Sequence, residues 1–250
     1  MPFIPIGDEN PRILIDKPMV TWTIIGLCVG AFLFQLSLDP VGERRIALAF
    51  GLIPAVLTGA ADLRPDLAVI PSWLTIVTSM FLHGGFGHLI SNMLFLGIFG
   101  DNVEDAMGHR RFVLFYVVCG AAAALTHVVI APGMTTPMIG ASGAISGILG
   151  AYLILHPKAW VTFLVFVFPF TLPAWILLGG WFVIQFLSAL GGGGGVAWWA
   201  HVGGFVAGML LVARFRHHTV PLGGGGRQPK GVRLKRRRPP PAGGRQGPWG

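Results

Sequence analysis

Several long apolar stretches with few charged residues constrain this chain more than any other feature of its sequence. The clearest, residues 19–38, contains 20 residues and no charged side chain, which is enough for a helix to cross about 30 Å of hydrocarbon. Charged residues make up 11% of the 250 residues, whereas a soluble domain carries about 25%. Because so few charges cannot coat a globule in water, we predict that lipid is the solvent for most of the chain.

The apolar stretches predict an all-α membrane protein, a bundle of six transmembrane helices that occupies residues 19–215. Residues 46–57 are apolar but too few to cross, and we expect them to lie on the membrane surface or to re-enter it. Pro169 and Pro173 interrupt a long apolar run. Since proline breaks helices, residues 159–172 are predicted to be an interfacial piece. The five further spans are predicted at residues 88–100, 112–130, 138–155, 174–190 and 198–215.

The basic residues are concentrated near the C-terminus. Of the 18 Lys and Arg, 10 lie at or beyond Arg214, so the net charge of +8 belongs to the tail. The core has no basic face, and we predict no nucleic-acid partner. With both termini in the cytoplasm, the inner segments hold 15 Lys and Arg and the outer segments three, as the positive-inside rule requires. We therefore predict a cytoplasmic N-terminal segment over residues 1–18 and a disordered, basic, Gly- and Pro-rich cytoplasmic tail over residues 216–250.

The two cysteines, Cys28 and Cys119, lie inside apolar stretches. Both are predicted to be buried as small hydrophobic residues, and their spacing indicates neither a disulfide framework nor a metal cluster. The N-terminus has no basic region followed by a cleavable apolar stretch, so we predict no signal peptide. These features lead us to expect a multi-pass protein of a bacterial inner membrane.

Polar residues are costly in lipid, so an intramembrane Ser, His or Asn is a candidate for function. The first candidate motif is Gly140-Ala141-Ser142-Gly143, at the start of the predicted fourth span. Small residues such as Gly143 let helices approach closely. A serine at a helix N-terminus also suits a nucleophile, because free N–H groups there favour developing negative charge. Taken alone, the motif favours the packing interpretation.

A histidine opens the predicted sixth span. His201 lies one turn before Gly204, and Gly204 and Gly208 have the spacing of a close helix contact. The neighbouring Trp198-Trp199 pair also fits an interfacial histidine. The predicted topology starts the fourth and sixth spans at the outer side, so Ser142 and His201 have similar depth. A neutral imidazole can take the proton of a serine hydroxyl, and we predict a Ser–His dyad, since no intramembrane Asp or Glu is available as a third member.

A third polar group enters the second span. His88 and Asn92 are four residues apart and share a helix face, and both carry N–H donors of the kind that an oxyanion needs. The competing interpretation is a zinc site formed by His83, His88 and His201. This set lacks the glutamate of a His-Glu-x-x-His helix and has Asn where a ligand would serve better. We therefore predict an oxyanion role, with no metal and no cofactor.

In chain order, these motifs resemble the rhomboid family of intramembrane serine proteases over residues 19–215. The resemblance is carried by the His83-x4-His88-x3-Asn92 run, by residues 140–143 and by residues 200–204, on the predicted second, fourth and sixth spans. Residues 99–105 also resemble the acidic loop after the family's second span. The fold that this resemblance implies is a six-helix rhomboid bundle with both termini in the cytoplasm.

The resemblance implies that Ser142 is the nucleophile and His201 the general base. Its implied substrates are membrane proteins with a transmembrane segment, cut in or near the bilayer on the outer side. The fifth span and the Gly191–Gly195 loop would form a mobile gate for substrate entry. The oxyanion hole is expected from Asn92, His88 and the Ser142 backbone N–H, and structural roles near the site from His83, Gly140, Gly143, Gly204 and Gly208.

Two other functional classes compete with a protease. Rhomboid-like proteins without protease activity bind membrane clients, but they typically lack the Ser or the His that this chain has. A channel or transporter needs polar residues through the full membrane thickness, and the inner halves of these spans are almost wholly apolar.

One departure from the family concerns the general base. Some members stack an aromatic residue, four positions after the serine, on the histidine, whereas this chain has Ser146 there.

Overall fold

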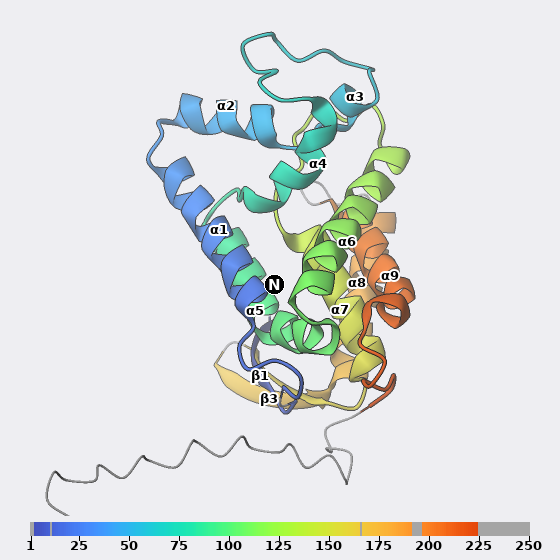
Figure 1. The fold of residues 1–250 in the computed structure, drawn as a ribbon. Coiled ribbons are helices and arrows are strands. Elements are labelled where there is room, and N and C mark those ends of the chain that lie inside the picture. The colour runs from blue at the N-terminus through green and yellow to red at the C-terminus, as the bar shows by residue number, and fades with distance from the viewer. Residues whose placement is uncertain (1–2, 11, 166, 192–196, 225–250) are drawn as a thin grey trace, which may run out of the picture.

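The computed structural model describes residues 3–10, 12–165, 167–191 and 197–224, which are mostly helical (Figure 1). The predicted Gly191–Gly195 loop, apart from Gly191, and the predicted tail beyond residue 224 lie outside the described residues. The longer helices are α1 (Met19–Leu36), α2 (Pro40–Phe50), α5 (Phe86–Met107), α6 (His109–Ile130), α7 (Ser142–Leu155), α8 (Ala174–Leu190) and α9 (Trp198–Phe215). The short helices are α3 (Pro54–Leu57), η1 (Ser72–Leu74), α4 (Thr75–Thr78) and η2 (Ser79–Phe81), and the strands are β1 (Phe3–Asp8), β2 (Trp160–Val165) and β3 (Phe168–Pro173).

Three of the described helices, α1, α6 and α9, are long and apolar enough to cross a membrane. A fourth candidate is the pair formed by Ser72–Phe81 and α5, which is bent by 83° at its break. The apolar helices α7 and α8 are shorter, with 14 and 17 residues. The chain is thus a mostly helical, multi-pass membrane protein with three to four candidate spans. The count of six spans and the cytoplasmic position of both termini stay predictions.

A three-stranded antiparallel sheet closes one end of the helix bundle, opposite α2 and α3 (Figure 1). The described chain is therefore not wholly helical, and the predicted interfacial piece over residues 159–172 forms β2 and β3. Val161 and Phe163 point inward from β2, as alternating β-branched and aromatic residues favour. Pro169 and Pro173 fit because β3 is an edge strand. The partner of β2 on its other side is β1, from the predicted N-terminal segment.

The end of α5 differs from the prediction. We expected the second span to stop at Gly100 and Asp101, Glu104 and Asp105 to face water, but the helix continues to Met107. These carboxylates hold the N-terminal segment instead. Asp105 accepts three backbone N–H bonds from residues 13–15, at 2.6–2.7 Å. Such charge-assisted bonds stabilise a carboxylate that has lost contact with water.

A second carboxylate from α5 caps α1. The N-cap residue of α1 is Pro18, whose side chain makes no capping hydrogen bond. Glu104, which is 0% exposed, accepts hydrogen bonds from the backbone N–H groups of Val20 and Thr21 and from the Thr21 hydroxyl, at 2.7–3.0 Å. His109 Nδ1 lies 2.5 Å from Glu104 Oε1, the oxygen that also accepts from Val20. Glu104 thus satisfies free N–H groups at the start of α1.

Replacing Glu104 by alanine is expected to lower the free energy of unfolding by about 3 kcal/mol or more, because it leaves buried donors without a partner. Thermal unfolding of the purified protein in detergent measures this loss. Glu43→Ala is the matched control, since Glu43 is an exposed first-turn acid of α2 and surface substitutions usually change stability by less than about 0.5 kcal/mol. Equal melting temperatures for the two variants would contradict the capping role.

The sheet is joined to the bundle by another buried acid. Asp8 at the end of β1 accepts hydrogen bonds from Tyr152 of α7 at 2.5 Å and from Asn102 of α5 at 2.9 Å. Burial raises the pKa of the Asp8 carboxyl, while the hydrogen bonds from Tyr152 and Asn102 act in the opposite direction. The N-terminal strand is therefore bonded to two helices of the bundle.

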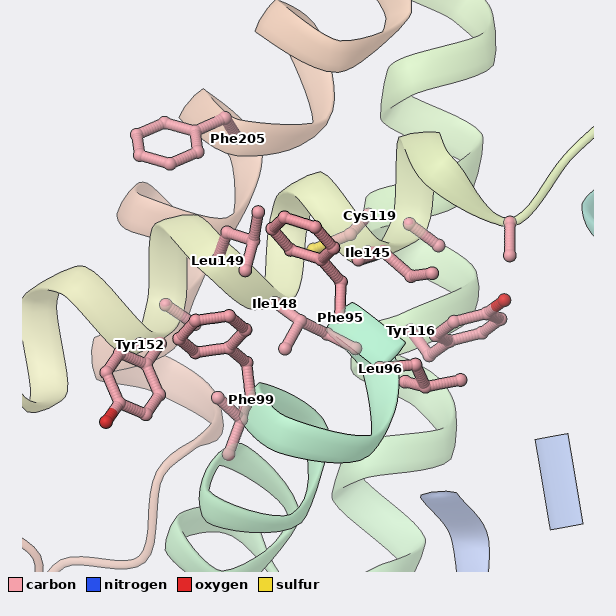
Figure 2. Packing of buried hydrophobic residues seen from close by; sticks show 14 of the residues in the cluster. Phe95, Leu96, Phe99, Tyr116, Cys119, Ile145, Ile148, Leu149, Tyr152 and Phe205 are labelled. Atoms are coloured by element: carbon pink, nitrogen blue, oxygen red, sulfur yellow. The ribbon is translucent and has the colours of Figure 1, made fainter. Parts of the chain in front are cut away.

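The hydrophobic core surrounds α7. Figure 2 shows Phe95 and Phe99 of α5 and Cys119 of α6 beside this helix, whereas the ring of Phe205 of α9 stacks on Phe182 of α8 with centroids 4.7 Å apart. Cys119 is fully buried there and Cys28 is buried elsewhere in the same core, and both are free thiols, which confirms their prediction as buried small residues. The labelled members of the cluster are Phe95, Leu96, Phe99, Tyr116, Cys119, Ile145, Ile148, Leu149, Tyr152 and Phe205.

Candidate active site

Ser142 is the first residue of α7, so its backbone N–H has no partner one turn earlier in the helix. The predicted start of this span at Met138 was four residues too early. Met138 forms an isolated bridge with Leu52, and Gly140 has a φ of +126°, a conformation that L side chains rarely adopt. The helix begins only after this glycine, which leaves Ser142 at its N-terminus.

The structure brings Ser142 and His201 together across two packed helices. The Nε2 atom of His201, in the first turn of α9, lies 2.8 Å from the Ser142 Oγ. His201 is 6% exposed, so the contact is shielded from bulk solvent. A hydrogen bond of this length between an imidazole and a hydroxyl is the geometry needed for proton transfer.

Glycines make this approach of α7 and α9 feasible. A Cβ atom at Gly204 would overlap the backbone oxygen of Gly143, and one at Gly208 would overlap the backbone oxygen of Gly147. The backbones of the two helices therefore touch directly, as small residues allow in lipid. Gly143 also faces α6, where an added Cβ would lie 2.8 Å from the Cβ of Ala123. The glycines that pack α7 against α9 are therefore the ones that let Ser142 and His201 approach each other.

One residue that the sequence reasoning missed lies on the other side of His201. The Oε1 atom of Gln185, on α8, is 2.7 Å from His201 Nδ1. The rings of Trp181 and Trp198 flank the imidazole, with centroids 6.2 and 6.0 Å away. Ser146, in contrast, bonds to the backbone oxygen of Ser142. The sequence does mark Gln185 as an amide within an apolar span. The predicted dyad rested on the lack of an intramembrane Asp or Glu and left an amide out as a third catalytic residue.

The candidate oxyanion donors lie beside Gly140. A Cβ at this glycine would be 2.7 Å from His88 Nε2 and 3.8 Å from Asn92 Nδ2. Asn92 is buried and its Nδ2 has no hydrogen-bond partner among the described residues. A buried donor without a partner is costly, which fits a group that is kept free for a ligand atom.

His83 has a different environment. Its ring is fully buried, with Nδ1 3.3 Å from the Phe81 backbone oxygen. The Gln35 side chain of α1 bonds to both the backbone N–H and the backbone oxygen of His83, at 3.1 Å each. These bonds tie the segment before α5 to α1 through the backbone of residue 83, and the structural role of the His83 side chain stays a prediction. Within the described residues, no three His, Cys, Asp or Glu side chains are placed to hold a metal ion.

A cavity of about 600 Å³ lies between the candidate catalytic pair and the candidate oxyanion donors. Its polar lining includes His127 of α6, whose Nε2 is 3.3 Å from the Met134 sulfur and which the sequence reasoning did not single out. The remaining wall is largely apolar, with residues such as Met80 and Ala123. A mostly apolar cavity with a few convergent polar groups is typical of a substrate site. The candidate site residues along it are His88, Asn92, Ser142 and His201.

Comparison with known proteins identifies the family of this chain. A family profile described as "Rhomboid domain" matches residues 71–218. The chain belongs to the rhomboid family. "RHOMBOID-like protein 6, mitochondrial" from Arabidopsis thaliana is 30% identical over 200 residues, which are 78% of this chain and 60% of that protein. "Rhomboid protease GluP" from Bacillus subtilis is 34% identical over 138 residues, which are 55% of this rhomboid chain and 24% of that protein.

These rhomboid relatives differ in length and in location. The chain spans 60% of the length of the first relative and 24% of the second. A third, "Rhomboid-like protein 11, chloroplastic" from Arabidopsis thaliana, is 37% identical over 90 residues, 36% of this chain and 31% of that protein. Because the names include a mitochondrial and a chloroplastic protein, the bacterial inner membrane stays a prediction for this rhomboid, whereas its multi-pass membrane character follows from the family and the helices.

If the chain has the protease activity that the family resemblance implies, replacing Asn92 by alanine is expected to lower its rate of peptide cleavage by about 10²–10³-fold, the usual effect of losing one oxyanion donor. The measurement is cleavage of a reporter with a transmembrane segment by purified protein in detergent. Ser91→Ala is the control. It removes a polar side chain next to Asn92, and the hydroxyl that it removes bonds to the His88 backbone oxygen. Cleavage by the folded Asn92 variant at the wild-type rate would remove this residue from the oxyanion hole.

Proposed function

We propose that this chain is an intramembrane serine endopeptidase that hydrolyses peptide bonds in or near transmembrane segments of membrane proteins. Ser142 is the nucleophile and His201 is the general base. The observation that carries the proposal is the 2.8 Å contact between Ser142 Oγ and His201 Nε2 on the wall of a cavity. Membership of a family that includes a named protease supports it.

The first half of the reaction forms an acyl-enzyme. His201 Nε2 takes the hydroxyl proton of Ser142 while Oγ attacks the carbonyl carbon of the scissile peptide. The carbonyl oxygen becomes an oxyanion and accepts hydrogen bonds from Asn92 Nδ2, from His88 and from the Ser142 backbone N–H. The position of Ser142 at the N-terminus of α7 adds the positive end of the helix dipole to this charge. The tetrahedral intermediate then collapses, and His201 gives its proton to the leaving amine.

The second half releases the product. A water molecule attacks the acyl ester, His201 takes its proton, and the ester oxygen leaves as the Ser142 hydroxyl when His201 returns the proton. Polar groups that converge on one cavity, such as His88, Asn92 and His127, give water hydrogen-bond partners in an otherwise apolar surrounding. The site can therefore hold the second substrate of hydrolysis within the membrane.

The lipid bilayer and a membrane protein with a transmembrane segment are the proposed partners. The substrate enters beside α8, and the scissile bond leaves its helix so that its carbonyl becomes accessible to Ser142. The alternative is a catalytically silent rhomboid-like protein that binds membrane clients. That class does not need a serine hydroxyl and an imidazole in hydrogen-bond contact, and the contact between Ser142 and His201 therefore favours the protease.

The experiment that tests this proposal needs no known substrate. The protein is purified in detergent and treated with a fluorescent fluorophosphonate, beside Ser142→Ala and His201→Ala. We expect the wild type alone to be labelled, because only a serine activated by its base reacts quickly with this probe. If none of the three folded proteins is labelled, the protease proposal fails and the client-binding alternative replaces it. Labelling of Ser142→Ala at the wild-type rate would assign the reactivity to another residue.

A further inference from the structure

The inward face of α8 is apolar except near its middle. The buried residues recur every three or four positions, and Gln185, which is 2% exposed, lies among Leu178, Trp181 and Ala189. An amide that is moved from water into an apolar surrounding without a hydrogen-bond partner is strongly disfavoured. Leucine at this position would avoid that cost. The polar partner that offsets it is His201, through the 2.7 Å contact between Gln185 Oε1 and Nδ1.

The chemistry of this contact determines where the imidazole proton lies. A carbonyl oxygen has no hydrogen and can only accept, so Nδ1 of His201 must carry the proton. In the neutral ring, Nε2 then has the free electron pair, and Nε2 is the atom 2.8 Å from Ser142 Oγ. The opposite tautomer would direct an N–H at Ser142 and could not take its proton. A general base needs the first tautomer.

We infer that Gln185 is the positioning residue of the site: its side-chain carbonyl accepts the Nδ1–H of His201 and holds the imidazole in the tautomer and orientation that serve Ser142. This inference rests on the proposed function. It makes the site a triad in geometry, with a neutral amide from α8 in the third position. In a lipid-surrounded site, an amide orients the base without the desolvation cost of an ionised carboxylate.

The aromatic residues around His201 restrict the ring in a second way. Trp181 lies one turn before Gln185 on α8, and its ring is tilted by 33° to the imidazole. Trp198 meets the imidazole edge-on at 89°. The ring is thus enclosed by α8 and α9, while Ser146 of α7 points its hydroxyl at its own helix. The base is therefore oriented by α8, in place of the aromatic residue that some members of the family carry on the serine helix.

Two substitutions separate positioning from packing. Gln185→Leu has a similar volume and lacks an acceptor, whereas Gln185→Glu keeps a carbonyl-type oxygen. If Gln185 only fills space, leucine is tolerated and a buried glutamate is the more damaging change. If Gln185 positions His201, Gln185→Glu reacts faster with fluorophosphonate than Gln185→Leu. We expect Gln185→Leu to react with fluorophosphonate about 10–100-fold more slowly than wild type, as misplacement of a reacting group does, and Gln185→Glu to retain most of the wild-type rate.

The experiment uses the full chain in detergent, with thermal unfolding measured beside labelling. Ser188→Ala, which removes a hydroxyl from the same helix, is expected to react at the wild-type rate. Nitrogen-15 spectra of histidine-labelled protein, assigned by the signals lost in His201→Ala, are expected to show Nδ1–H for wild type and a mixture of tautomers for Gln185→Leu. If Gln185→Leu does not fold, the reactivity of Gln185→Glu and the wild-type tautomer decide the question.

The outcomes distinguish this inference from the function on which it rests. Wild-type labelling that is lost in Ser142→Ala but unchanged in Gln185→Leu would overturn the positioning role and leave the protease intact. Reactivity that is higher in Gln185→Leu than in Gln185→Glu would also overturn it, because that order belongs to packing. Absence of labelling in wild type would overturn the protease proposal itself, together with the role of Gln185.

Discussion

Replacing Ser142 by alanine is expected to reduce cleavage of a transmembrane reporter by at least about 10⁴-fold, because no other group can form the acyl-enzyme. His201→Ala should cause a loss of similar size, since the two residues act as one unit and their effects do not add. The measurement is the rate at which purified protein in detergent or liposomes cleaves a single-span reporter that the wild type accepts. Folding of each variant is checked by its thermal unfolding.

Ser146→Ala provides the matched control for Ser142→Ala. Ser146 lies one turn further along α7, and its hydroxyl bonds to the Ser142 backbone oxygen at 2.7 Å. The control removes the same chemical group from the same helix without removing the proposed nucleophile. We expect Ser146→Ala to cleave the reporter at close to the wild-type rate. Equal rates for Ser142→Ala and the wild type would refute the assignment of the nucleophile.

Replacing Gly208 by valine is expected to abolish the reactivity of Ser142, although the substitution lies outside the catalytic pair. Gly208 lies two turns along α9 from His201, and a Cβ there would overlap the backbone of Gly147. Because backbone atoms cannot move aside, α7 and α9 must separate. Overpacking of this kind costs about 1–3 kcal/mol, and a displacement of about 1 Å between Ser142 and His201 costs about 10²-fold in rate. We expect a lower unfolding temperature and at least that loss of fluorophosphonate labelling.

The control for this prediction is Gly30→Val in α1. It introduces the same β-branched side chain into a membrane helix at a glycine where an added Cβ meets nothing within 4 Å. Its unfolding temperature and labelling rate should stay near those of the wild type. If both variants lose activity alike, valine in a membrane helix is the cause, and the direct backbone contact of α7 with α9 is not what the site depends on.

The sequence by itself determined where the main apolar helices lie. The predicted spans at residues 174–190 and 198–215 have the same ends as α8 and α9, and the first differs from α1 by two residues at its end. These elements follow from local physics. An uncharged stretch must bond its backbone internally in lipid, and Pro18 and Pro173 mark where a helix can start. The motifs around Ser142, His201 and Asn92 could also be read from the sequence, because polar groups in apolar spans are conspicuous.

Only the tertiary structure decided which distant groups bond to one another. The sheet joins Phe3 to Val165, and Glu104 caps a helix that begins 85 residues earlier at Met19. The contact of Gln185 with His201 crosses from α8 to α9. Apolar burial has no direction and is visible in the composition of a segment, whereas a hydrogen bond needs two atoms at one distance and angle. Those pairs exist only after the helices have packed, and so the bond that makes Gln185 the third member of the site became visible only in the folded chain.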